Sequence, residues 1–198
     1  MASILKVDTI QDQSGNNIIN ENADTITIGA SGDTITVPTG ASLTVPNGGL
    51  SGQNYPAFEA YLSSNQTVSD GTATKAQINT EVLDTNGYYD NSTNYRFTPL
   101  IAGKYFVYGS VYARTATSSD LDWGITYIYK NGAVYREQIT QFSNNRGRQA
   151  SVYISAIIDM NGSSDYIELF GSTNVSAGTP QFNSLNKGTF FGAYRIGA

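Results

Sequence analysis

The 198-residue sequence contains no histidine and no cysteine. Without histidine, the commonest general base, the usual partner of a catalytic serine and the commonest metal ligand are all missing. Without cysteine, there are no disulfides, thiolate metal sites or thiol nucleophiles. The sequence therefore lacks residues that most hydrolase active sites require. We expect a protein that is not an enzyme, has no catalytic residues and needs no cofactor.

Charged residues are also few, at 14% of the chain, and the formal net charge is -5. An acidic chain has few cations to neutralise phosphates, so nucleic acid is not an expected partner. No apolar run approaches the length of a transmembrane helix, and the first residues lack the apolar stretch of a secretory signal. We therefore expect neither membrane insertion nor secretion.

Glycine (20 residues), tyrosine (14), threonine, serine and asparagine are abundant, a balance that favours strands and turns over helices. Alternating β-branched and aromatic runs predict strands at 104–113, 122–130, 150–159, 166–172 and 189–195. Asn131-Gly132, between two such runs, predicts a type I′ hairpin. No window has sustained helical periodicity, so the sequence predicts an all-β sandwich of roughly eight to ten strands.

A repetitive segment precedes this domain. Threonine or serine alternates with an aliphatic residue at 25–28, 34–37 and 42–45, which predicts three short strands. The repeated apolar residues are Ile26, Ile28, Ile35, Val37, Leu43 and Val45. Two aliphatics per strand cannot be buried within one chain, so we expect copies of the chain to intertwine around an axis as a β-stalk. The alternative is a Gly/Thr-rich linker.

The segment from Val82 to Tyr108 resembles a signature of the C1q and tumour-necrosis-factor-like family, in which an Asn-Gly turn precedes aromatics, a Phe, a proline and Gly-x-Tyr. The signature residues are Asn86, Tyr88, Phe97, Pro99, Gly103 and Tyr105. The runs YKNG, NGSSDYIEL and GTFFGAYRI are also similar to blocks of this family. The resemblance implies a ten-stranded jelly-roll knob over residues 57–198, a homotrimer, and both ends of the knob near the trimer base.

The opening run LKVDTIQDQSGNNII is similar to the openings of tailed-phage structural proteins. This resemblance implies a virion protein, a tail or capsid fibre assembled in the host cytoplasm. Residues 1–22 would dock on other virion proteins, residues 23–56 would form the stalk and a Gly/Pro linker, and the knob would attach to the host surface. Two alternatives stay open: an architectural virion protein without a receptor, such as a capsid decoration or tail joint, and a secreted C1q-like lectin.

Tyrosines favour trimerisation independently of the resemblance, because tyrosine offers a large contact area with few rotors to freeze. The candidates are Tyr105, Tyr108, Tyr112, Tyr127, Tyr129, Tyr153 and Tyr194. For any one of them, a place in the core is the alternative.

Three residues are candidates for ligand-binding loops, with a host surface glycan as the possible ligand. Arg146 and Arg148 could grip an anionic sugar, or serve solubility alone. Trp123, the only tryptophan, could stack on a sugar face, or lie in the core or an interface.

The pattern Asp-x-Asn-Gly-x-x-Asp occurs twice. Its members are Asp84, Asn86, Gly87 and Asp90, and Asp159, Asn161, Gly162 and Asp165. Such oxygen-rich loops can bind calcium, but Asp and Asn also stabilise their own turns, which is the reading that we favour. The carboxylate pairs Asp120/Asp122 and Glu137/Asp159 have no spacing that favours catalysis.

Overall fold

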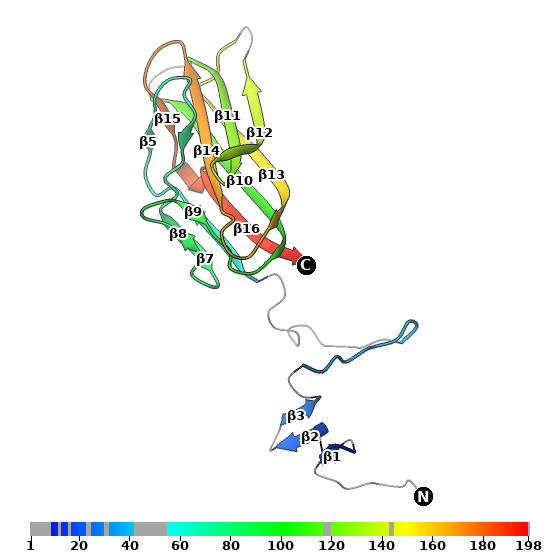
Figure 1. The fold of residues 1–198 in the computed structure, drawn as a ribbon. Helices are drawn as coiled ribbons and strands as arrows, with labels where there is room; N and C mark the ends of the chain where they lie inside the picture. Colours follow the sequence, from blue (N-terminus) through cyan, green and yellow to red (C-terminus); the bar gives the residue numbers. More distant parts are fainter. Residues whose placement is uncertain are drawn as a thin grey trace, which may run out of the picture. The chain divides into compact units, whose positions relative to one another are not determined.

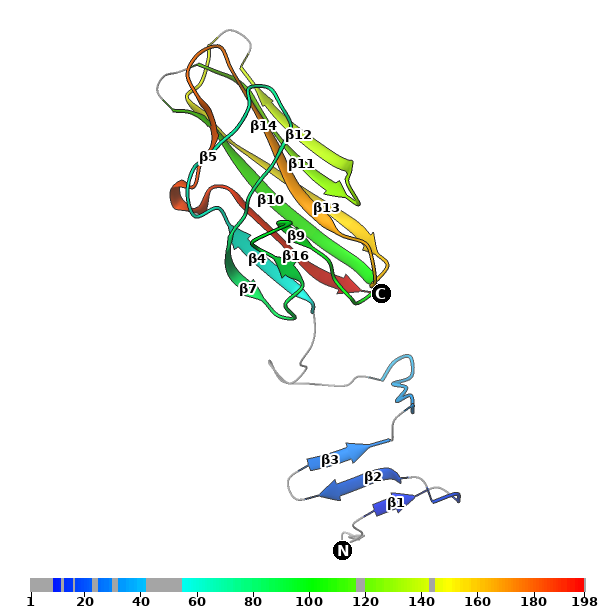
Figure 2. The ribbon, with the colours of Figure 1, turned by 60° about the vertical axis from the view of Figure 1, so that its left-hand side comes forward.

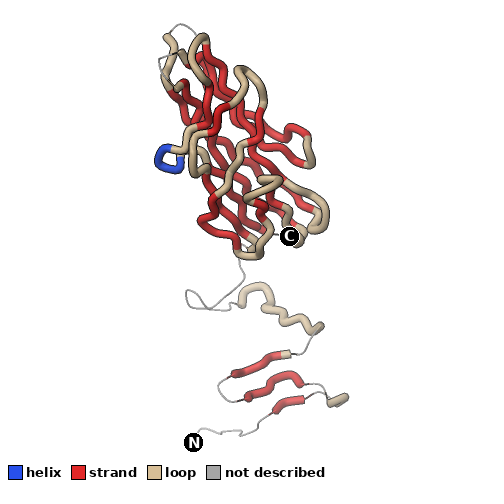
Figure 3. The backbone as a smooth tube through the Cα atoms, turned by 90° about the vertical axis from the view of Figure 1, so that its left-hand side faces the viewer, coloured by secondary structure: helices blue, strands red, loops and turns tan. Residues whose placement is uncertain are grey.

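A computed structural model describes residues 9–11, 13–15, 17–22, 25–29, 32–41, 55–116, 120–142 and 145–197. The chain divides into two units, Met1–Leu50 and Ser51–Ala198. In the described ranges the structure is β throughout, apart from the short 3-10 helix η1 (Leu185–Lys187) (Figure 3). The all-β prediction is confirmed. No helix in these ranges is long and apolar enough to cross a membrane.

The second unit has thirteen strands within the described ranges. They are β4 (Ala57–Tyr61), β5 (Gln66–Thr67), β6 (Thr74–Lys75), β7 (Thr80–Asp84), β8 (Tyr89–Asp90), β9 (Arg96–Phe97), β10 (Gly103–Thr115), β11 (Leu121–Lys130), β12 (Ala133–Gln141), β13 (Gln149–Met160), β14 (Ile167–Val175), β15 (Pro180–Phe182) and β16 (Phe190–Gly197). The runs predicted at 104–113, 122–130 and 150–159 lie within β10, β11 and β13, and those predicted at 166–172 and 189–195 begin one residue before β14 and β16. The total exceeds the predicted eight to ten because β5, β6, β8 and β9 have only two residues each and carry no alternation.

These strands form two antiparallel sheets that pack face to face (Figures 1 and 2). Sheet I has the order β5-β15-β10-β16-β4-β7, with β13 paired to β10. Sheet II has the order β12-β11-β14-β9-β8, with β6 paired to β14. The longest strands, β10 and β13, pair over their whole length from Gly103↔Met160 to Arg114↔Gln149.

The alternation along each strand decides what lies between the sheets. On β10, Tyr105, Val107 and Val111 are fully buried, while Phe106, Tyr108 and Tyr112 point to the other face. An aromatic cluster fills one end of the core, where the Phe58 ring stacks on Tyr89 and Phe97, each at 4.5 Å between centroids. The second unit therefore has a complete core of its own.

Local turn chemistry places the loops. Asn131 and Gly132 have φ values of 53° and 79°, and Lys130 pairs with Ala133 across them, which confirms the predicted hairpin. Ala57 at the start of β4 pairs with Tyr194 of β16, so the beginning of the knob lies beside its end (Figure 1). The opposite end of the knob is formed by loops that connect its strands.

The first unit contains one small antiparallel sheet of β1 (Thr9–Gln11), β2 (Asn17–Asn22) and β3 (Thr25–Ile28). Strand β3 is the first of the three predicted strands. The β2–β3 pairing, from Ile19↔Ile28 to Asn22↔Thr25, joins residues of the predicted docking segment to the beginning of the predicted stalk.

The strand predicted at 34–37 is wrong, because residues 33–38 have no regular structure. Alternation of polar and apolar residues favours a strand, but no strand among the described residues pairs with this segment. Ile35 and Val37 are accordingly 64% and 44% exposed. The third predicted strand, at 42–45 with Leu43 and Val45, lies outside the described residues.

Candidate functional surfaces

Sheet I carries aromatic rings on the side that points away from the core, which we call the aromatic face. Its members are Phe106, Tyr108, Tyr153, Phe190 and Tyr194. Phe106 lies 5.9 Å from Tyr108 and 5.6 Å from Tyr194 between ring centroids, and Tyr153 lies 6.1 Å from Phe190. Strand pairing gathers them, since Phe106 is opposite Tyr194. Beside Tyr153, which is 64% exposed, lies an open hollow of about 270 Å³, also lined by Tyr108 and Phe190.

A carboxylate fixes the centre of the aromatic face. Tyr108 Oη donates a hydrogen bond of 2.7 Å to Glu59 Oε2 of β4. A side chain on Gly192 would lie 2.5 Å from the Tyr108 ring, so this glycine lets the ring lie flat on β16. Burial, and then the bond to Glu59, raise the pKa of the Tyr108 hydroxyl, which therefore remains a donor. Nothing in the sequence pointed to Glu59, because its partner is 49 residues away.

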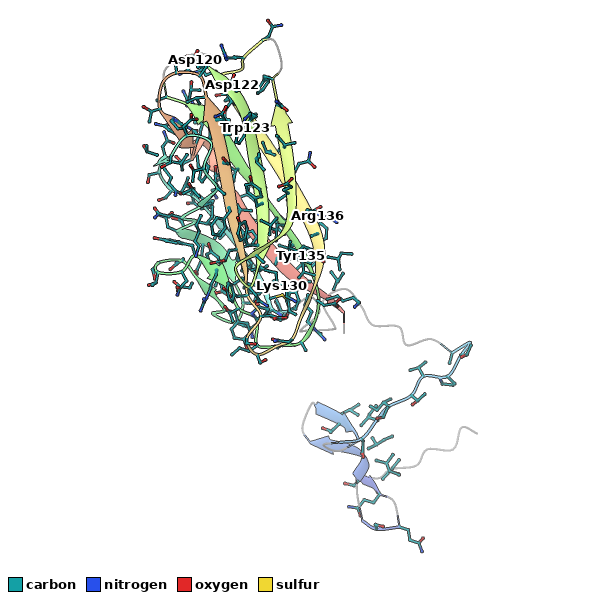
Figure 4. All side chains as sticks on the ribbon, turned by 45° about the horizontal axis from the view of Figure 1, so that its top comes forward. Asp120, Asp122, Trp123, Lys130, Tyr135 and Arg136 are labelled. Atoms are coloured by element: carbon teal, nitrogen blue, oxygen red, sulfur yellow. The ribbon has the colours of Figure 1, made fainter. Side chains whose placement is uncertain are left out.

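A second partly apolar surface lies along β12 and the neighbouring strand β13, and we call it the β12 edge. Tyr135 Oη donates to the Ile157 carbonyl at 3.0 Å, and Arg136 Nη1 donates to the Ser155 carbonyl at 2.7 Å. Figure 4 labels both residues on β12. Val134 and Ile139 on β12 are 52% and 47% exposed and point to the outer side of sheet II. Ile157, which is 56% exposed, lies opposite Phe106 on the aromatic face. Side chains of β12 therefore cap the outer carbonyls of β13.

The tyrosines predicted for a trimer interface fall into three groups. Tyr105 is fully buried, donates to the Ile101 carbonyl at 2.8 Å, and has a pKa that burial raises to about 12. An interface role for Tyr105 is therefore wrong, because the odd positions of β10 face the core. Tyr108, Tyr112, Tyr153 and Tyr194 lie on the outer side of sheet I, and Tyr127 and Tyr129 lie on the outer side of sheet II.

The three candidate ligand residues are near one end of the knob but differ in their surroundings. Arg146 Nε lies 2.5 Å from Asp122 Oδ1, so this guanidinium is paired. Arg148 has an exposed side chain, and its carbonyl accepts a bond from Thr115 N at 3.1 Å. Trp123 is half-buried on the outer side of sheet II, at the same end of the knob as Asp120 and Asp122 (Figure 4). The arginines therefore do not form a free basic pair beside the indole.

The signature residues are mainly structural. Phe97, Pro99 and Tyr105 are buried, Tyr88 packs against the core, and Asn86 lies in an exposed turn. Gly103 has a φ of 144°, and a side chain there would meet the Gly197 carbonyl at 2.3 Å. Only glycine therefore allows β10 and the end of β16 to approach this closely.

The two Asp-x-Asn-Gly runs form turns. Asp84 accepts backbone N–H bonds from Asn86, Gly87, Tyr88 and Tyr89 at 2.9 to 3.3 Å. In the second run, Asn161 Oδ1 accepts three N–H bonds from residues 163–165 at 2.9 to 3.0 Å. No group of three or more acidic side chains that could hold a metal ion lies together in the described part of the chain. The geometry supports turn stabilisation and gives calcium binding no support.

The carboxylates weighed for catalysis have other partners. Asp159 pairs with Lys104 Nζ at 2.6 Å, and Asp122 pairs with Arg146. Each of these two carboxylates therefore has a cationic partner.

No protein-family model matches the sequence, and no curated protein matches it either. Among solved structures, the chain is similar to Eiger TNF from S. frugiperda, with 12% identity over 70% of this chain and 90% of that chain, at a TM-score of 0.52. It is also similar to murine APRIL, with 13% identity over 70% and 97% of the two chains and a TM-score of 0.50. The globular domain of zebrafish complement 1qA protein is 12% identical over 71% and 96%, at 0.49. At such low identity the likeness to the first two establishes the fold alone: a TNF/C1q-like jelly roll.

Proposed function

We propose that the protein is a homotrimeric structural protein of a virus particle, a tail or capsid fibre whose knob attaches to the surface of the host cell. The observation that carries the proposal is the aromatic face, which leaves five large rings outside a core that is already complete. Soluble monomers rarely expose contiguous apolar patches of this kind, so a partner surface is expected to cover it.

A second copy of the chain is the partner that the knob itself can supply. The aromatic face and the β12 edge are different surfaces, both partly apolar, on neighbouring sides of β13. Contact between the edge of one copy and the face of the next is heterologous, and such contacts close into a ring when the rotation permits. The resemblance of residues 82–108 to compact trimers favours a ring of three.

The first unit supports the same assembly. Ile10, Ile26 and Ile28 are 41%, 67% and 54% exposed on a sheet of only three short strands. Such a sheet is marginal without a hydrophobic face to pack on. Three copies around one axis would cover these side chains, and the preceding residues would dock on other virion proteins.

Attachment in this proposal works through multivalency. Because the beginning and end of the knob lie together, the loops at the opposite end are free to face a host surface. Three weak sites on one rigid trimer raise the effective concentration of each site for a surface that carries many copies of the receptor. No catalytic step is required.

Three measurements test the proposal in sequence. Light scattering coupled to size-exclusion chromatography should give three times the chain mass of 21.3 kDa, and a folded monomer at micromolar concentration would exclude the fibre. Gold-labelled antibody against the knob should decorate virus particles, and particles without label would exclude the virion role. Antibody fragments against the knob should then slow adsorption to host cells. An unchanged adsorption rate on labelled particles would replace attachment with the purely architectural role.

A further inference from the structure

Trp123 is presented on the outer side of sheet II by an irregularity in its strand. The pairing of β11 with β14 shifts between Leu121↔Val175 and Trp123↔Asn174, which leaves Asp122 as an extra, bulged residue. A bulge of this kind re-aims side chains. Here the Asp122 side chain forms an ion pair with Arg146, and Trp123 is one of the residues of β11 that point to the outer side of sheet II.

Two amide side chains flank this indole. Trp123 is directly opposite Gln141 on β12 and Asn174 on β14, and side chains of directly opposite residues share a face at about 5 Å between Cβ atoms. We propose that Trp123, Gln141 and Asn174 form a carbohydrate-binding site, in which one face of a sugar ring stacks on the indole and the amides bond to its hydroxyls.

The loop between β5 and β6 holds the site in shape. Asp70 Oδ1 accepts a bond from Val175 N at 2.8 Å and one from Asn174 Nδ2 at 3.3 Å, so the amide oxygen of Asn174 remains as an acceptor. Gly71 lies against both residues: a side chain there would come within 3.3 Å of Asn174 Nδ2 and 3.9 Å of Trp123 Cζ2. Any side chain at this position would therefore crowd Asn174 and contact the edge of the indole.

The aromatic row continues along β11, which extends the site beyond one sugar. Tyr127 follows Trp123 by four residues on the same side, about 13 Å farther along the strand. Tyr129 comes next, and its ring stacks on Phe170 at 4.0 Å between centroids. A row of rings with flanking polar groups suits an oligosaccharide that runs along the strand.

The charges around the site select an uncharged sugar. Asp122 is paired with Arg146, but Asp70 lies beside Asn174 and Glu137 lies opposite Tyr127, and the chain carries a net charge of -5. A polyanionic glycan would be repelled by this acidic protein, whereas neutral hydroxyls match amide donors and acceptors. The site is therefore expected to take neutral hexopyranose chains.

This inference rests on the proposed function and gives its receptor a chemical class. In the proposed trimer, the aromatic face of sheet I is covered by the next copy. That contact uses β12, the terminal strand of sheet II, whereas Trp123 and Tyr127 lie on the next strand, β11. Their aromatic row therefore remains open to solvent and to a host glycan.

The sole tryptophan makes the test direct, because intrinsic indole fluorescence of the full-length protein reports on Trp123 alone. Titration with maltohexaose, cellohexaose, laminarihexaose and chitohexaose should give a saturable emission change with at least one of them. Gln141→Ala and Asn174→Ala should each weaken binding about fivefold, the usual size for one lost neutral hydrogen bond. Gln138→Ala, the same residue type on the opposite side of β12, should leave affinity unchanged.

Calorimetry extends the test to the indole itself. Trp123→Ala should weaken binding at least tenfold, as the loss of an aromatic anchor does, while Trp123→Tyr should retain most of it. Equal affinity of Trp123→Ala, or no emission change with any of the four sugars, would overturn the site. The proposed function is judged separately, since particle adsorption that is blocked by knob antibody would stand without a sugar site, and sugar binding would stand without adsorption.

Discussion

The two units place their aliphatic side chains in opposite environments. In the knob, Val107, Ile158 and Ile167 are completely buried, whereas in the first unit Ile26 and Ile35 are 67% and 64% exposed. Burial of apolar surface contributes about 25 cal/mol per Å², so the first unit gains little of this stabilisation within one chain. Alternation of aliphatic and polar residues therefore gives a stable fold only where a second sheet covers the apolar side.

The same contrast is repeated inside the knob, between its two sets of aromatic rings. Phe58, Phe97 and Phe191 are closed in the core, while Tyr153 of the aromatic face lies mainly in solvent. The first set holds the chain together and the second is available to another molecule. Substitutions in the core should therefore lower the stability of the single chain, and substitutions on the aromatic face should weaken its assembly with other copies.

The largest effect is expected from Phe58→Ala in the core. Phe58 contacts three other rings and is 1% exposed, so its removal leaves a cavity and should lower the free energy of unfolding by about 3–5 kcal/mol. Urea denaturation at a fixed protein concentration measures the loss. Leu100→Ala, at a side chain that is 55% exposed, is the matched control and should change stability by less than about 0.5 kcal/mol. Equal effects of the two would mean that the core is not where the knob gains its stability.

Tyr153→Asp should break assembly and spare the fold. A charge on the aromatic face at this position would be buried in the proposed trimer, at a cost of about 2–4 kcal/mol in association. Light scattering should then give the mass of a monomer, while the far-ultraviolet circular dichroism remains that of the native sandwich. Gln77→Asp, at an exposed loop position, is the control and should stay trimeric. A trimeric Tyr153→Asp would move the interface elsewhere.

The long strands of the knob could be predicted because apolar and polar residues alternate along them, which is a local property of the sequence. On β10, Tyr105, Val107 and Val111 face the core from alternate positions, and Asn131-Gly132 tolerates the positive φ of its turn. The likeness of residues 82–108 to a known family also located structural residues such as Phe97 and Gly103. Periodicity and turn-forming residues depend only on neighbouring positions, so they can be recognised in the sequence alone.

Features that depend on distant partners could not be predicted. The two-residue strand β6 is paired with β14, and β9 is paired with both β14 and β8, whereas no described residue pairs with the strand expected at 34–37. The Tyr108–Glu59 bond and the opposition of Trp123 to Asn174 likewise join residues about 50 apart. The tyrosines showed the same limit, because the sequence alone did not tell that Tyr105 faces the core.

A smaller effect is expected at a turn, where pH should distinguish an anchored carboxylate from an exposed one. Asp90 accepts the N–H of Thr93 at 2.9 Å, which is the main cause that lowers its pKa below the ordinary 3.8. The folded knob therefore binds this proton less readily than the unfolded chain. Its stabilisation is complete above about pH 4 and is lost as the pH falls below 3.8 toward the folded pKa.

Asp90→Asn should consequently lower the unfolding free energy by about 1 kcal/mol at pH 7, and the difference from the wild type should shrink at pH 2.5. Urea titrations at the two pH values measure it. Glu81→Gln, at an exposed position on β7, serves as the control and should leave stability unchanged at pH 7. If the variant were less stable than the wild type by the same amount at both pH values, the charge of Asp90 would not be the cause of the stabilisation.

The smallest effect on the knob is expected from Ile26→Ser in the first unit, and it sharpens the comparison most. Because Ile26 is 67% exposed in the single chain, the substitution should leave knob unfolding within about 0.5 kcal/mol of the wild type. If other copies cover this side chain in the trimer, the first unit of the variant should be cleaved faster by protease while the knob stays intact. Thr27→Ser, one position away on the same strand, should retain wild-type cleavage. A loss of knob stability as large as that of Phe58→Ala would instead make the two units one cooperative structure.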